Sequence, residues 1–220
     1  MNLLIRYYKL SKTSLFFGIV LSNLFVVWLS QTFLINEIVF YNTYSEQLTM
    51  DRSLQLLESV RKFSWVSYAF IPLMLIIKFT LISIVIYTGI FFYNLNDKVT
   101  FGTVSKIVIA SEIIIVIASL IKFLWLYLFG GNYDLNDIGF FYPLSLINLF
   151  KINEVDRIWI FPLQIVNLFQ VVYIIALSYG LKKACNLGES DSDRIVLSSY
   201  LPAMVVWIVF IMFISFDTAI

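Results

Sequence analysis

Long apolar runs alternate with short polar stretches along most of the chain. A helix needs about 20 mainly apolar residues to cross a hydrocarbon core roughly 30 Å thick, because it rises about 1.5 Å per residue. Five runs reach that length, so the pattern predicts an all-α fold: a polytopic membrane helical bundle in a single integral membrane domain over residues 1–220. The predicted spans are 14–35, 65–93, 103–129, 159–181 and 195–216.

The connection between the first two runs also has helical periodicity. In the stretch SLQLLESVRKFSW, the apolar residues Leu54, Leu57 and Val60 recur at helical spacing. We expect a helix that lies on the second span or leads into it. The first run is too long for the apolar core of a signal peptide and lacks a small-residue cleavage site, so we expect it to stay as a membrane anchor.

A near-repeat of nine residues precedes the fourth run. The stretch YPLSLINLF, residues 142–150, returns as FPLQIVNLF, residues 161–169. Proline is favoured in the first turn of a helix, so Pro143 and Pro162 predict two helix starts. The second start opens the fourth span. The first is followed too soon by the polar stretch KINEVDR to cross a bilayer, and therefore predicts a short re-entrant or interfacial helix over about 142–150.

Amide side chains follow these two prolines. Asn148 and Asn167 each lie five residues after their proline, and an asparagine in hydrocarbon needs a hydrogen-bond partner, typically on a neighbouring helix. Gln164, Asn167 and Gln170 recur at steps of three, which spreads them over about 120° of one helix face. This stripe indicates either hydrogen bonds between helices or the lining of a substrate path.

Three charged residues fall inside the predicted spans. They are Lys78 in the second span and Glu112 and Lys122 in the third. An unpaired charge near the centre of a spanning helix costs on the order of 2.5 to 3.5 kcal/mol. Counted from the span ends, Lys78 and Glu112 lie at nearly the same depth on antiparallel neighbours, which predicts that they pair. Lys122 lies further along and is expected to extend toward the outer interface.

The Lys78–Glu112 pair allows two interpretations. It can be structural, holding helices of this chain or of another subunit together, or it can belong to a proton or ion relay.

Composition excludes several classes of function. The chain is 60% hydrophobic and 13% charged, contains no histidine and only one cysteine, and has a net charge of +1. Histidine is the commonest metal ligand and general base, so we expect no enzyme, no metal and no cofactor. The stretch GGNYDLNDIG does not match the glycine and glutamate positions of a calcium loop. The low net charge argues against nucleic acid as a partner, which leaves the lipid bilayer and other membrane proteins.

Basic residues favour one orientation. Short loops on the cytoplasmic side carry an excess of lysine and arginine. The amino-terminal side holds more of them than the opposite side, which predicts a cytoplasmic N-terminus, an outside C-terminus and a cytoplasmic loop at Cys185. The two sets are Arg6, Lys9, Lys12, Lys98, Lys106, Lys182, Lys183 and Arg194 against Arg52, Arg61, Lys62, Lys151 and Arg157.

The C-terminal half of the chain, from the third span to the end, resembles the Yip-domain membrane proteins. The resemblance rests on PLQIVNLFQVVYIIALSYGLKKACNLGESDSDRIVLSSYLPAMVVW: a helix opening on Pro-Leu, an Asn-Leu-Phe run, a Gly-Leu end to the fourth span, a polar turn and a final apolar span. It implies a prokaryotic-type, non-enzymatic, five-span bundle in the bacterial cytoplasmic (inner) membrane. The long soluble N-terminal region through which eukaryotic members act in vesicle traffic with small GTPases has no counterpart ahead of residue 14.

Two functions fit these observations. The chain can be an accessory or scaffold subunit of a larger membrane complex, which agrees with its short loops and its lack of catalytic groups. Alternatively it can be a small transporter or permease-like subunit, with Lys78, Glu112 and the amide stripe lining a polar path.

Overall fold

The computed structural model describes residues 10–44, 49–95, 97, 99–131, 133–151 and 154–217. Within these ranges the regular elements are helices, and one isolated β-bridge joins Ser145 to Asn167. The predicted all-α fold is therefore confirmed. In chain order the helices are α2 (Lys12–Leu29) with the π turn η1 (Ser30–Leu34), α3 (Glu37–Tyr44), α4 (Met50–Phe92), α5 (Phe101–Ser111), α6 (Ile113–Phe129), α7 (Leu135–Phe140), the 3-10 helix η2 (Leu146–Leu149), α8 (Arg157–Ile165), α9 (Leu168–Cys185) and α10 (Glu189–Asp217).

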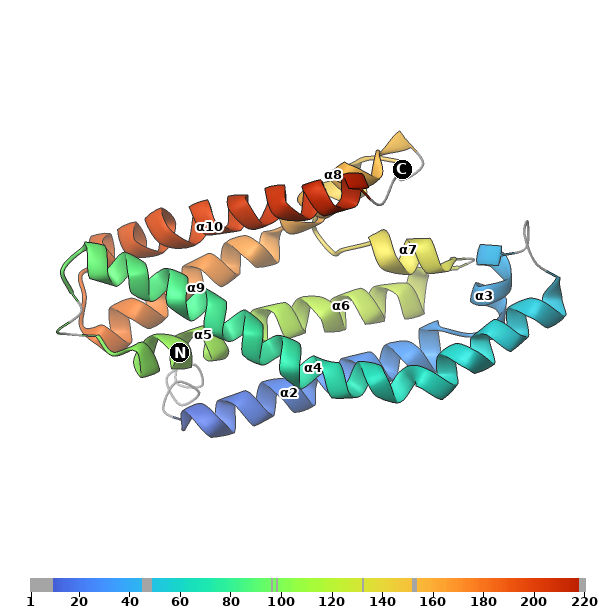
Figure 1. Ribbon diagram of the computed structural model, residues 1–220, viewed down its shortest axis with the longest axis horizontal. Coiled ribbons are helices and arrows are strands. Elements are labelled where there is room, and N and C mark those ends of the chain that lie inside the picture. Colours follow the sequence, from blue (N-terminus) through green and yellow to red (C-terminus); the bar gives the residue numbers. More distant parts are fainter. Residues whose placement is uncertain are drawn as a thin grey trace.

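The chain runs back and forth along the long axis of the molecule (Figure 1). The start of α2, the α4–α5 connection and the α9–α10 connection lie at one end, on the left of Figure 1. Helices α3, α7 and α8 lie at the other end, together with the end of α10. We call these the α9–α10 end and the α3 end.

Four segments are long and apolar enough to cross a membrane: Lys12–Leu34, Met50–Phe92, Phe101–Phe129 and Ser190–Ser215. The remaining predicted span, 159–181, is not one continuous helix, so the prediction of a single helix over these residues is wrong. The chain leaves the helical conformation at Val166, with ψ at 89°, and at the extended Asn167, so α8 and α9 are separate helices.

Helix α4 is longer than a single crossing requires. Its 43 residues extend over about 64 Å at 1.5 Å per residue, roughly twice the thickness of the hydrocarbon core. The first turns, which contain Leu54, Leu57 and Val60, continue directly into the apolar part. The helix expected in this connection therefore leads into the second span, and it carries the α3 end of α4 beyond the rest of the bundle (Figure 1).

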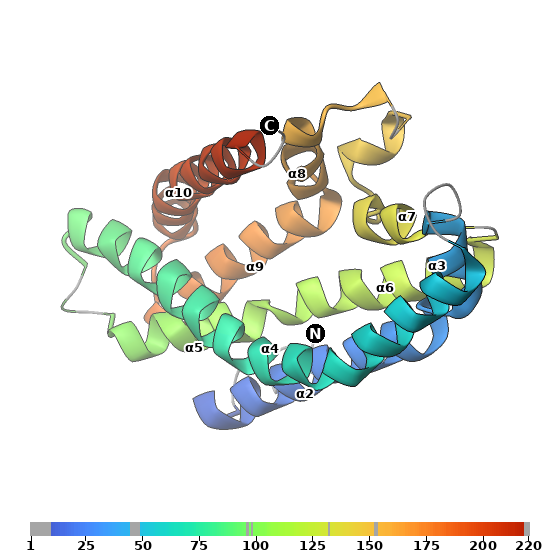
Figure 2. The same cartoon turned by 45° about the vertical axis from the view of Figure 1, so that its right-hand side comes forward.

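The core is centred on α5. Nearly every residue from Val104 to Ser111 is buried, because α2, α4 and α9 all pack against this short helix. Helix α10 closes the bundle by packing on α9, α4 and α8 (Figure 2). A smaller apolar cluster near the α3 end contains Leu34, Phe123 and Leu126. The first half of the third pass is thus the buried axis of the bundle, and Glu112 at its end is withdrawn from the surface.

The two basic sets lie at opposite ends of the bundle, as the alternating passes require. Lys12, Lys106, Lys182, Lys183 and Arg194 belong to the α9–α10 end, whereas Arg6, Lys9 and Lys98 fall outside the described residues. Arg52, Arg61, Lys62, Lys151 and Arg157 belong to the α3 end. Which end faces the cytoplasm stays a prediction.

Thiol labelling tests that orientation. Cys185 is only 8% exposed, so the unaltered chain should label poorly and serves as its own control. Lys183 and Gln55 are exposed near opposite ends. With the N-terminus in the cytoplasm, a membrane-impermeant thiol reagent added to intact cells should label Gln55→Cys and leave Lys183→Cys unlabelled until the cells are opened. The reverse pattern would invert the topology.

Candidate functional site

The third pass changes helix at Glu112, between α5 and α6. The Glu112 N–H donates to the Ile109 carbonyl, three residues back, at 3.3 Å, which tightens the last turn of α5. Its own carbonyl accepts from the N–H groups of Ile115 and Val116 at 3.0 and 3.1 Å. The junction therefore keeps its backbone hydrogen-bonded, and it sets the Glu112 carboxylate inside the bundle, where the residue is 2% exposed.

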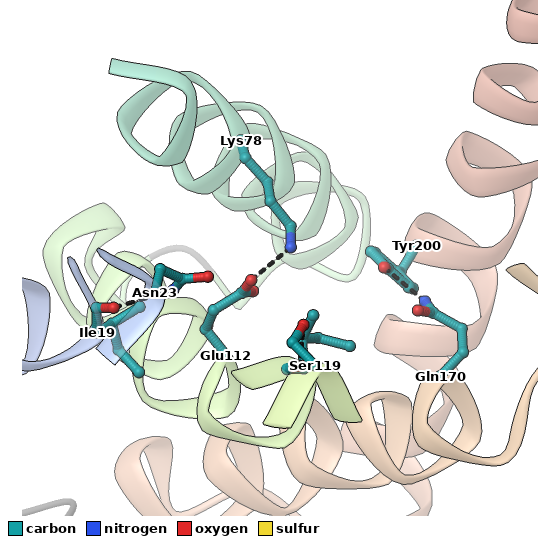
Figure 3. A network of polar contacts seen from close by, with 8 residues as sticks. Ile19, Asn23, Lys78, Glu112, Ser119, Gln170 and Tyr200 are labelled. Atoms are coloured by element: carbon teal, nitrogen blue, oxygen red, sulfur yellow. Dashed lines mark hydrogen bonds and ion pairs between the residues drawn. The ribbon is translucent and has the colours of Figure 1, made fainter. Parts of the chain in front are cut away.

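Lys78 reaches this carboxylate from α4. Its Nζ donates to Glu112 Oε1 at 2.6 Å, the short distance typical of a charge-assisted hydrogen bond (Figure 3). The pairing predicted from depth is thus formed. The two partners differ in environment, because the Glu112 side chain is 2% exposed and that of Lys78 is 41% exposed.

A second polar contact lies beside the pair. Gln170 Nε2, on α9, donates to the Tyr200 hydroxyl on α10 at 2.8 Å and contacts Met204 Sδ at 3.5 Å (Figure 3). Tyr200 and Glu112 each lie eleven residues, or about 17 Å, after the first residue of their helical pass. Both passes begin at the α9–α10 end, so the two residues lie at nearly the same depth. We call Lys78, Glu112, Gln170 and Tyr200 the mid-bundle layer.

Two buried side-chain oxygens at the α5–α6 junction have no hydrogen-bond partner within the described ranges. They are Glu112 Oε2 and Ser111 Oγ, on consecutive residues. An unsatisfied buried acceptor is costly, so such atoms often mark a place that a proton, a water molecule or an ion occupies. Chemically, the layer can hold or pass a proton, or bind a small polar solute beside Lys78.

Tyr142 extends this environment toward the α3 end. Its burial, and after that the negative charge of Glu112, raise the pKa of Tyr142 to about 12. The phenol is therefore a neutral hydroxyl at physiological pH and can donate a hydrogen bond but not act as a base.

The predicted stripe of amides does not form on one helix face, because the chain breaks between α8 and α9. Gln164 Nε2 donates to the carbonyls of Gly139 and Phe140, at the end of α7, at 3.0 and 2.8 Å. Gln170 reaches α10 instead. Both glutamines therefore link helices, the first of the two roles expected for them, and they do not line a common path.

Asn167 is the N-cap of α9. Its Oδ1 accepts from the Gln170 N–H at 2.8 Å, and its Nδ2 donates to the carbonyls of Gln164 and Ile165. Asn148 is exposed and donates to the Tyr142 carbonyl at 2.6 Å. The prediction that these two asparagines reach neighbouring helices is wrong, because both satisfy backbone groups next to them in turns.

The two copies of the repeat lie antiparallel against each other. The Leu146 N–H donates to the Val166 carbonyl at 3.0 Å, and the Leu168 N–H donates to the Leu144 carbonyl at 3.1 Å, on either side of the Ser145–Asn167 bridge. Each copy supplies the backbone partners of the other. The backbone hydrogen bonds between the two copies thus hold the start of α9 in place.

Neither proline starts a helix. Pro162 is the sixth residue of α8, which begins after Asp156, a residue type favoured at N-caps. Pro143 lies in a turn, and the expected helix over 142–150 reduces to the 3-10 helix Leu146–Leu149. The segment neither crosses the bundle nor is wholly extended, in agreement with the non-spanning part of the prediction.

Lys122 takes no part in the mid-bundle layer. It is half-buried on α6, ten residues beyond Glu112, and forms no ion pair with any described residue. No group of three or more metal-ligating side chains gathers anywhere in the described ranges. Sequence reasoning missed Ser111 and Tyr200, although counting depth along the last span, as for Lys78 and Glu112, would have found Tyr200.

No protein-family model matches the chain, and comparison with curated proteins and with solved structures finds no similar one. The resemblance to Yip-domain proteins stays a prediction.

Proposed function

We propose that this protein is a non-enzymatic subunit of a larger membrane complex and that its partner packs against α4 near the middle of the membrane. The observation that carries the proposal is the exposure of Lys78. Its side chain is 41% exposed although the residue lies about 21 Å, or fourteen residues, from the Phe92 end of α4.

That depth makes contact with lipid unfavourable. A lysine near the centre of a spanning helix costs on the order of 2.5 to 3.5 kcal/mol, and pairing with Glu112 offsets the charge on one side only. A second polypeptide covering the exposed side of Lys78 removes the rest of that cost. The apolar surface that surrounds Lys78 on α4 extends the contact, with Leu81 52% exposed one turn away.

A matched pair of tryptophan variants tests the proposal. Leu81 lies about 60° from Lys78 around α4, whereas Ile76, which is 50% exposed, lies about 160° away at nearly the same depth. The tagged protein, extracted gently from its own membranes, should show a stoichiometric complex with another membrane protein by native mass spectrometry. Leu81→Trp should dissociate that complex, and Ile76→Trp should leave it intact.

The proposal fails if the unaltered protein is recovered alone or only with copies of itself. It also fails if the two variants behave alike, since a partner that ignores the face of Lys78 leaves the exposed charge unexplained.

A second function, transport of a proton or a small polar solute, is favoured by the unpartnered Glu112 Oε2 and Ser111 Oγ. Transport requires water around Lys78 where the subunit proposal requires protein. Leu81→Cys, made together with Cys185→Ala, distinguishes them, because a small permeant thiol reagent modifies a cysteine in a water-filled path and spares one covered by lipid or protein.

A further inference from the structure

A groove of about 910 Å³ lies between the end of α2 with its π turn and the first half of α4. The segments that line it, the end of α2 and the first half of α4, lie toward the α3 end of the bundle (Figure 1). The wider π turn places Gln31 and Thr32 on one wall, and α4 forms the other wall from Ser59 to Tyr68.

Hydrogen-bond donors without a partner line this groove. Ser59 and Ser64 donate to carbonyls of their own helix, at 2.9 and 2.8 Å, and are satisfied. Six other lining side chains carry donors that bond to no residue in the described part of the chain: Trp28, Gln31, Thr32, Arg61, Ser67 and Tyr68. Donors gathered in this way can bind a ligand rich in acceptor oxygens.

The charge of the groove points to an anion. Arg61 is the one charged residue in the lining, and no carboxylate accompanies it. Arg61 takes part in no ion pair with a described residue, so its guanidinium is available. A guanidinium matches a phosphate group with two parallel hydrogen bonds.

The depth of the groove and its apolar wall favour an anionic lipid over a free anion as the ligand. Trp28 and Ile35 lie about 24 and 34 Å along the axis from Lys12, on either side of the far boundary of a hydrocarbon core 30 Å thick. Ile35, Val60, Phe63 and Val66 add apolar surface to the same groove. A free phosphate has no apolar part that could pack against this wall. The glycerol region and upper acyl chain of a lipid can cover it.

We propose that the groove binds one phospholipid with a net negative headgroup, from the leaflet at the α3 end, and that Arg61 holds its phosphate. Gln31, Thr32 and Ser67 supply further donors to the phosphate and ester oxygens. The absence of a carboxylate in the lining disfavours headgroups that carry an ammonium group.

Native mass spectrometry of the delipidated protein in detergent, with added dioleoylphosphatidylglycerol or dioleoylphosphatidylcholine, tests this proposal. One phosphatidylglycerol per chain should bind at least about tenfold more tightly than phosphatidylcholine. Arg61→Gln should remove that preference. Arg52→Gln is the matched control: it removes an exposed arginine on the opposite face of α4, outside the groove, and should leave binding unchanged.

Three results would overturn the proposal: equal binding of the two lipids, equal loss in both arginine variants, or displacement of the lipid by inorganic phosphate. If Arg61→Gln does not fold, Thr32→Val combined with Ser67→Ala removes two donors with little change in volume and must weaken phosphatidylglycerol binding in the same direction.

Discussion

Lys78→Met alone should lower the free energy of unfolding by about 3 to 5 kcal/mol, the usual cost of removing one partner of a buried ion pair. It leaves the Glu112 carboxylate, 2% exposed, without its only hydrogen-bond partner among the described residues. Glu112→Leu should cost on the order of 2.5 to 3.5 kcal/mol, because it leaves the 41% exposed Lys78 unpaired near the centre of a spanning helix.

The double variant Lys78→Met/Glu112→Leu should recover much of that loss, since apolar replacement of both partners of a buried ion pair is often neutral or better. A double-mutant cycle on thermal unfolding in nanodiscs measures the coupling. Lys122→Met is the control for removing any lysine from a span: Lys122 is half-buried and has no ion-pair partner in the described ranges, so its loss should be neutral or stabilising.

Additive losses in the cycle would mean that the two side chains do not meet in the membrane. The same double variant also distinguishes the roles of the pair. A structural pair leaves the variant folded and still bound to its partner subunit, whereas a proton relay leaves it folded, assembled and inactive.

The crossings and the ion pair could be predicted because both depend on length. A run of apolar residues has to match the thickness of the hydrocarbon core, and two opposite charges on antiparallel helices have to meet at one depth. Counting residues was therefore enough to predict that Lys78 pairs with Glu112. Counting cannot show which side of a charge stays uncovered, and the exposure of Lys78 emerges only from the packing of α4.

The break before α9 depends on contacts between segments, and the apolar run from 159 to 181 hides it. No glycine interrupts that run before Gly180, and Pro162 lies within α8. One signal was present: Asn167 and Gln170 have the N-cap and N3 spacing of a helix start. Their role as a cap became plain only with the Leu144–Leu146 backbone, which satisfies Val166 and Leu168 across the bridge.

Gly89→Ala should separate α4 from α10, and its expected effect is the largest among the glycines of the spanning helices. A Cβ at Gly89 would lie 2.8 Å from Ser199 Cβ and 2.9 Å from Ser199 Oγ, closer than real Cβ contacts allow. Small residues let spanning helices approach in this way. Overpacking of a core typically costs about 1 to 3 kcal/mol. Gly89→Leu, with three more carbons at the same contact, should exceed that range.

Gly18→Ala is the matched control on α2, because nothing lies within 4 Å of a Cβ built at Gly18. Alanine exceeds glycine in helix propensity by about 1 kcal/mol, so this variant should be neutral or more stable. Gly89→Ala gains the same propensity and should still lose stability, which isolates the contact with Ser199 as the cause.

A second substitution, at Ser199, tests whether the contact between residue 89 and Ser199 causes the loss of stability. Ser199→Gly removes both the Cβ and the hydroxyl that meet the new methyl group, so Gly89→Ala/Ser199→Gly exchanges the small residue between α4 and α10. Thermal unfolding of the four chains in nanodiscs should give a favourable coupling between the two sites, measured against Ser199→Gly alone because glycine itself weakens α10. If Gly89→Ala is as stable as the unaltered chain, α4 and α10 pack less closely there than 2.8 Å implies. If it is destabilised and Ser199→Gly gives no coupling, the added methyl group meets a different part of the bundle.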